Sequence, residues 1–200
     1  MEITLIRFAS LISILAVLLL VSTTNTSSAT SVIQNLLETW EGFDLYENPS
    51  KGIQIRYLAN WTVDDSTDTN DPAFMVLFQA PNKSADIIVY AANMDDTRLG
   101  LQEILDFTIE SYRNSSKDFS LIRSSASADL SGYPAYELVY NDRSVIDNSL
   151  LKIMERGTKI GNKLYTIIYE ANASVFPSHV YAFEEMLDSF EPAPLSSLIR

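Results

Sequence analysis

The chain has 200 residues, no cysteine, and 26 acidic against 14 basic residues, which gives a net charge of −12. This charge argues against nucleic acid as a partner, because phosphate binding requires clustered lysine and arginine. The absence of cysteine excludes disulfides, thiolate catalysis, thiolate metal sites and a lipoprotein anchor. The length and a hydrophobic content of 46% predict one globular domain that buries its own core.

The N-terminus has the pattern of an export signal. Arg7 precedes an apolar run from Phe8 to Val21, and a polar stretch of small residues follows. The run covers 14 positions, fewer than the roughly 20 that a bilayer span needs. Ser27 and Ala29 supply small residues at −3 and −1 of a cleavage site. We therefore expect a signal peptide at 1–29 and an extracytoplasmic protein peripheral to the membrane, with an uncleaved anchor as the less favoured alternative.

The first half of the remaining chain predicts two β-hairpins. A strand from Phe43 ends at a turn marked by Pro49 and Gly52, and an alternating strand returns. Trp61 and Val63 are expected to close this first unit. The residues of the returning strand and of the second hairpin are 53–57, 73–78 and 87–91.

A helix is predicted next, from about Leu99 to Arg113, because apolar residues recur there at helical spacing. Asp95 and Asp96 are expected to cap its free N–H groups. Four strands follow, and a closing helix begins near Pro177, a residue suited to the first turn. The four strands are expected at 119–124, 133–140, 150–156 and 163–170.

The connections between strands are mostly too short for parallel crossovers. The sequence therefore predicts an α+β fold, an antiparallel β-sheet flanked by helices. We expect a linker or short helix at 30–42, one domain at 43–191 and a tail at 192–200.

Several segments, in order along the chain, resemble the PsbP family, known from an extrinsic subunit of photosystem II and from PsbP-like proteins. The segments that carry the resemblance are Phe43–Asn48 with Gly52–Ile53, Trp61, Phe78–Pro81, Ile87–Tyr90, Ser131–Leu138, Gly161–Ile167 and Asp188–Phe190. The resemblance implies an α/β/α sandwich around an antiparallel sheet. It also implies docking on a membrane complex, where photosystem members help to retain calcium and chloride. The acidic balance departs from the basic docking surface of those members, so the resemblance favours a PsbP-like protein of another role.

An acidic segment is the main candidate metal site. Asp64, Asp65, Asp68 and Asp71 offer oxygen ligands suited to calcium. An EF-hand loop needs glycine at its sixth position and glutamate at its twelfth, and neither register of this segment provides them. A solvated loop is the favoured interpretation, and a weak calcium site is the alternative.

No catalytic constellation is present. His179 is the single histidine and could serve at most one metal or nucleophile site, so we expect it to be structural or exposed. Glu184 and Glu185 lie near enough in sequence to join it in a weak divalent metal site, but carboxylates on a helix surface are usually solvated. The predicted strands carry several tyrosines, for which core packing is favoured over a partner-binding face. These tyrosines are Tyr133, Tyr136, Tyr140, Tyr165 and Tyr169.

Glycosylation sequons of the form Asn-x-Ser/Thr occur repeatedly, and four of them fall near predicted turns. They begin at Asn25, Asn60, Asn82, Asn114 and Asn172, whereas Asn48 is followed by proline and does not qualify. The sequence as a whole favours a non-enzymatic binding or assembly module that docks on a membrane-associated protein complex at the outer face of the membrane. A carrier of calcium or of a small ligand, held between sheet and helix, is the alternative.

Overall fold

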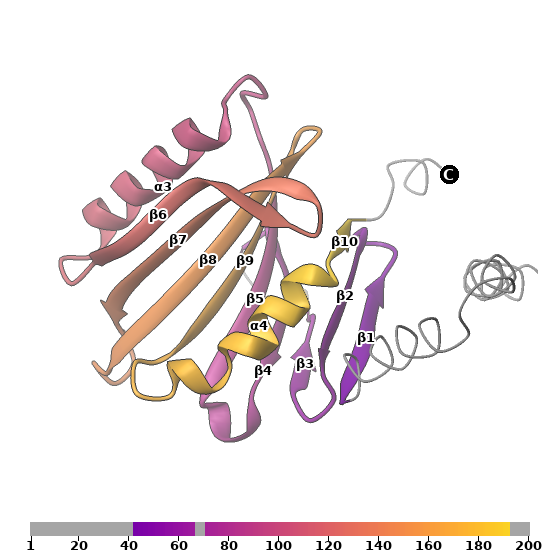
Figure 1. Cartoon of the computed structure of the whole chain (residues 1–200), viewed down its shortest axis with the longest axis vertical. Helices are drawn as coiled ribbons and strands as arrows, with labels where there is room; N and C mark the ends of the chain where they lie inside the picture. The colour runs from indigo at the N-terminus through magenta and orange to yellow at the C-terminus, as the bar shows by residue number, and fades with distance from the viewer. Residues whose placement is uncertain (1–41, 67–70, 193–200) are drawn as a thin grey trace, which may run out of the picture. The chain divides into compact units, whose positions relative to one another are not determined.

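The computed structural model describes residues 42–66 and 71–192, and they form the α+β fold that the sequence predicts (Figure 1). All of its helices and strands lie within the unit Phe43–Arg200. In chain order they are β1 (Phe43–Asn48), β2 (Ile53–Leu58), β3 (Thr62–Asp64), β4 (Phe74–Gln79), η1 (Pro81–Lys83), β5 (Ala85–Asn93), α3 (Leu101–Ser115), β6 (Ser120–Leu130), β7 (Tyr133–Arg143), β8 (Leu150–Ile160), β9 (Lys163–Asn172), η2 (Phe176–Ser178), α4 (Val180–Asp188) and β10 (Glu191–Pro192).

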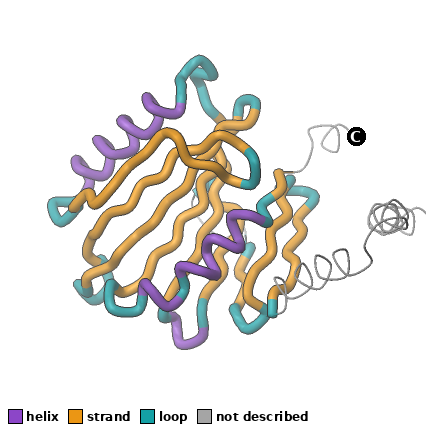
Figure 2. Tube along the Cα trace, viewed as in Figure 1, coloured by secondary structure: helices purple, strands orange, loops and turns teal. Residues whose placement is uncertain are grey.

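The strands form two sheets, and every pair in them is antiparallel. The larger sheet has the order β3-β4-β5-β9-β8-β7-β6, and the smaller has the order β1-β2-β10. Figure 2 shows that strands make up much more of the described chain than helices do. The predicted hairpins are confirmed as β1–β2 and β4–β5. The short strand after Trp61 does not close the first hairpin as expected, because β3 pairs with β4 in the larger sheet.

One pairing brings distant parts of the chain together. β5 lies beside β9, with Ala85 opposite Ala171 and Asn93 opposite Lys163, although α3 and three strands separate them in sequence. This pairing joins the β4–β5 hairpin and the four later strands, β6 to β9, into one continuous sheet. The sequence pattern predicted the strands but not this order.

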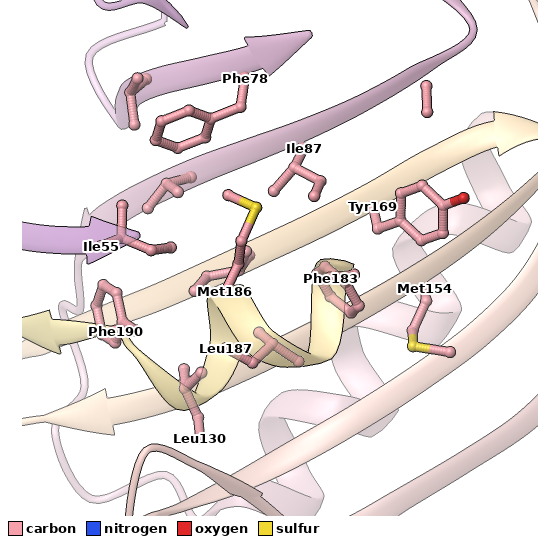
Figure 3. Close-up of a cluster of buried hydrophobic side chains, with 14 of the residues drawn as sticks. Ile55, Phe78, Ile87, Leu130, Met154, Tyr169, Phe183, Met186, Leu187 and Phe190 are labelled. Atoms are coloured by element: carbon pink, nitrogen blue, oxygen red, sulfur yellow. The ribbon is translucent and has the colours of Figure 1, made fainter. Parts of the chain in front are cut away.

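The larger sheet is covered on its two faces by different helices. Successive side chains of a strand point to opposite faces, so Leu138 packs in the cluster beneath α3 while Val139 joins the cluster beneath α4. Figure 3 shows α4 directing Phe183, Met186 and Leu187 into the second of these clusters. All three are fully buried.

The start of α3 differs from the prediction. The helix begins at Leu101, and Glu103 reaches back to accept a hydrogen bond from the Gly100 N–H at 2.8 Å. Asp96 instead accepts from the backbone N–H of Arg98 at 2.9 Å. Asp95 and Asp96 therefore lie in the preceding loop, and the cap comes from within the helix because Glu103 stands at the third helical position.

No helix of residues 42–66 and 71–192 is long and apolar enough to cross a membrane. The predicted signal peptide at 1–29, the linker up to residue 41 and the tail from residue 193 lie outside the described residues. They stay predictions.

Candidate interaction site

The face of β6 and β7 that points away from α3 carries charged side chains. In Figure 1, α4 crosses in front of β5, and β6 and β7 contribute Leu130, Ala135 and Val139 to the cluster beneath this helix. Glu137 lies on this face, because its neighbours Tyr136 and Leu138 both pack beneath α3. Arg156 of β8 lies directly opposite Glu137 in the strand register.

Four of these side chains form a chain of alternating charge, which we call the charge ladder. Arg123 Nε donates to Glu137 Oε1 at 2.8 Å, and Arg156 Nη2 donates to Glu137 Oε2. Arg156 Nη1 also reaches Glu184 Oε2 on α4 at 3.4 Å. The ladder thus joins β6, β7, β8 and α4.

Glu137 is the centre of the ladder. Its side chain is only 13% exposed, and burial acts to raise the pKa of the carboxyl. The hydrogen bonds and positive charges of Arg123 and Arg156 outweigh burial and hold the pKa of Glu137 below its ordinary value. Glu137 is therefore a carboxylate at neutral pH, fixed between two guanidinium groups.

The two arginines have different environments. Arg156 is 13% exposed and also donates to the carbonyl oxygen of Asp129 at 3.1 Å, but its Nε has no hydrogen-bond partner among the described residues. The side chain of Arg123 is 57% exposed and uses Nε for its bond to Glu137. Arg123 can therefore offer its terminal nitrogens to a carboxylate or carbonyl group of a partner.

A second group of polar side chains is sealed beneath α3. Glu155 of β8 is 1% exposed and accepts hydrogen bonds from Tyr112 at 2.7 Å and from Tyr136 at 2.5 Å. Burial raises the pKa of the Glu155 carboxyl, although both tyrosine hydrogen bonds act to lower it. This group holds α3 on the sheet and presents no atom to a ligand in solution.

The predicted calcium residues are partly engaged with the protein itself. Asp64 accepts from the Ser66 N–H at 3.0 Å, and Asp65 accepts from the Tyr46 hydroxyl at 2.9 Å. Asp71 accepts from the Ala73 N–H at 2.8 Å, and Asp68 lies outside the described residues. Across the two described ranges, no three carboxylate or histidine side chains gather as a metal site would require. Calcium binding by this segment stays a prediction.

His179 lies at the start of α4, where its ring meets that of Trp61 edge-on at a centroid distance of 5.4 Å. Its carbonyl oxygen accepts the Phe183 N–H at 3.0 Å. Glu184, which the sequence placed near His179, turns to Arg156 instead. These contacts agree with a structural histidine.

The tyrosines do not form a single exposed face. Tyr136 and Tyr140 are buried beneath α3, whereas Tyr165 and Tyr169 are buried in the cluster beneath α4. Core packing is therefore the correct interpretation for these four. The charge ladder was missed, although a glutamate and an arginine within strands otherwise rich in apolar residues were a visible signal.

The small-ligand alternative placed its ligand between sheet and helix. There, Leu105, Ile109, Leu138 and Tyr140 are buried and packed together. Two open grooves of about 570 and 470 Å³ lie instead along α3 and share Glu110 and Asn114 in their lining.

The fold and the ladder define a class of protein: an α+β domain with helices on both faces of an antiparallel sheet and a cluster of paired charges on one of them. Comparison with solved structures shows that it is the PsbP-like fold. Cyanobacterial PsbP (CyanoP) from Synechocystis superposes with a TM-score of 0.58 at 18% identity, covering 76% of this chain and 92% of that one. LpqN of Mycobacterium tuberculosis, described as involved in cell envelope biogenesis, gives 0.58 at 14% identity, covering 76% and 91%. No family model and no curated protein matches the sequence.

Proposed function

We propose that this chain is a non-catalytic, extracytoplasmic binding or assembly module that docks on a membrane-associated protein complex through the charge ladder. The predicted export signal at 1–29 and the PsbP-like fold support this role. LpqN, which shares the fold, is described as acting in cell envelope biogenesis, a setting that such a module would fit.

The charge ladder is the observation that carries the proposal. Beside α4, Arg123 presents an exposed charge on this face, and alternating charges around it would select a partner with the complementary order of charges. Arg123 is the accessible arginine of the set, and the buried Arg156 and Glu137 hold it in one orientation. Charges arranged in this way contribute specificity more than raw affinity.

The test is affinity purification of the tagged full-length chain from the native membrane fraction under mild extraction. Arg123→Glu reverses the exposed charge of the ladder, and we expect at least about a tenfold loss of the specific partner, equivalent to about 1.4 kcal/mol. Arg98→Glu is the matched control, because Arg98 is an exposed arginine paired with Asp96 in the loop before α3. Equal recovery with both variants would exclude the ladder as the docking site, and the absence of any specific partner would contradict the function itself.

A further inference from the structure

The glycosylation sequons of the described chain gather at one end of the larger sheet. Asn172 ends β9 at this end, where it lies opposite Leu151 of β8. Asn82 lies in η1, just before Ala85, which pairs with Ala171. The turns that hold Asn82 and Asn172 are therefore neighbours, although 90 positions separate them in the sequence.

The other two sequons reach the same end by different routes. Asn60 precedes β3, whose first residue, Thr62, pairs with Gln79 at the η1 end of β4. Asn114 lies in the last turn of α3, and its sequon hydroxyl, on Ser116, donates to Asp142 at 2.6 Å. Asp142 lies opposite Leu151, the strand partner of Asn172. All four asparagines are exposed.

The opposite end of the sheet has asparagines but no sequon among the described residues. Asn93 lies there at the end of β5 and Asn162 in the β8–β9 turn, and neither has a serine or threonine two residues later. Asn48 bonds to Asp65 beyond the far end of β3, and its triplet is blocked by Pro49. Both ends of the sheet thus carry asparagines, but among the described residues only one end has them within glycosylation sequons.

The sequon at Asn172 has a geometry that the other three lack. Its Oδ1 accepts both the backbone N–H of Ser174 at 3.1 Å and the Ser174 hydroxyl at 2.7 Å. The hydroxyls of the other sequons bond to other groups, as Thr62 does to the Gln79 carbonyl at 3.4 Å. In the folded chain, the Asn172 sequon therefore already joins its amide and hydroxyl in one turn.

We propose that this end of the sheet is a glycan-bearing end, with N-linked sugars on Asn60, Asn82, Asn114 and Asn172. In the transfer, the side-chain Nδ2 attacks the anomeric carbon of a lipid-linked sugar phosphate or pyrophosphate. The N–C bond forms, the C–O bond to phosphate breaks, the lipid phosphate leaves with the electron pair, and the amide proton passes to a base of the transferase. The inference rests on the export that the proposed function includes, because such donors are used on the outer side of a membrane.

The sugars would cover an apolar loop at the same end. Val145 and Ile146, between β7 and β8, are 101% and 94% exposed. Hydrogen bonds from the Ile146 and Asp147 N–H groups to the Ser144 hydroxyl hold this loop in place. Flexible hydrated glycans on the neighbouring turns would keep this loop from associating with other chains. The sugars would leave Glu137 and Arg156 of the charge ladder uncovered, because both lie in the middle of their strands.

The experiment is glycopeptide and intact-mass spectrometry of the full chain made in its native cells and recovered by cell fractionation. We expect a mass above that of the polypeptide, with the highest occupancy at Asn172, and the loss of one glycan for each Asn→Gln change at the four sites. Asn162→Gln is the control and should change nothing beyond the substitution itself.

A gain-of-site variant separates the possible failures. Asp95→Thr creates an acceptor at the exposed Asn93, at the opposite end of the sheet. Sugar on Asn93 with none on the four native sites would overturn the inference while export stands. An exported chain that carries no sugar even on Asn93 would overturn it as well. An unmodified chain found only inside the cell would overturn both this inference and the proposed function.

Discussion

The hydroxyl of Tyr112 on α3 donates a hydrogen bond to Glu155 Oε2 on β8 at 2.7 Å, and this contact holds the helix on the sheet. Tyr136 donates to the other oxygen of the same carboxyl. The larger sheet therefore contains two glutamates in opposite settings. Glu155 is buried among neutral groups, and Glu137 is held between two arginines.

Glu155→Gln should make stability less dependent on pH. Burial raises the pKa of Glu155 in the folded chain, so its contribution is fully present below the unfolded pKa, about 4.3, and is lost as pH rises through the folded value. Glutamine stays neutral throughout. Urea unfolding from pH 4 to 8 should show the variant gaining stability over the natural chain as pH rises. Glu110→Gln, on the exposed side of α3, controls for the loss of a carboxylate, and a Glu155→Gln difference that is flat with pH would contradict the prediction.

Glu137→Gln should show the opposite pH dependence. The pKa of Glu137 is lowered by its two arginines, so its contribution is present above the unfolded pKa and is lost as pH falls through the folded value. We expect the variant to lose about 2 kcal/mol at pH 7, because hydrogen bonds to charged groups contribute about that much. The loss should shrink below about pH 4. A loss that persists unchanged at pH 3 would show that packing, not charge, is responsible.

Gly157→Ala should destabilise the fold by about 1–3 kcal/mol, the usual cost of overpacking a core. Gly157 lies directly opposite Tyr136, and a Cβ there would overlap the tyrosine ring. Thermal and urea unfolding measure the loss. Tyr136→Leu removes the ring, so the Gly157→Ala change should cost less in that background, and fully additive effects would refute the steric explanation.

Calcium titration should decide whether the acidic segment binds calcium. If it binds calcium, calorimetry at millimolar calcium gives heat that disappears when Asp64, Asp65 and Asp68 are all changed to Asn. The Asp95→Asn, Asp96→Asn variant is the control, because these carboxylates are as close in sequence but lie before α3. Absence of heat with the natural chain would remove the metal-binding alternative.

Local patterns in the sequence were sufficient for the elements of this fold. Alternation and turn residues predicted the β1–β2 and β4–β5 hairpins, and apolar spacing predicted α3 and the closing helix. The cap of α3 was predicted wrongly, because Asp96 has a nearer donor in Arg98. These features depend on residues a few positions apart, which is the range over which a sequence pattern is informative.

Only the tertiary structure decided what lies together. Glu137, Arg156 and Glu184 become neighbours through strand pairing and the position of α4, and Glu155 becomes buried because Tyr112 packs over it. The sequons were visible in the sequence, but their gathering at one end follows from the pairing of β5 with β9. Pairing of this kind joins residues far apart in the chain, and its free energy comes from shared burial that no local pattern records.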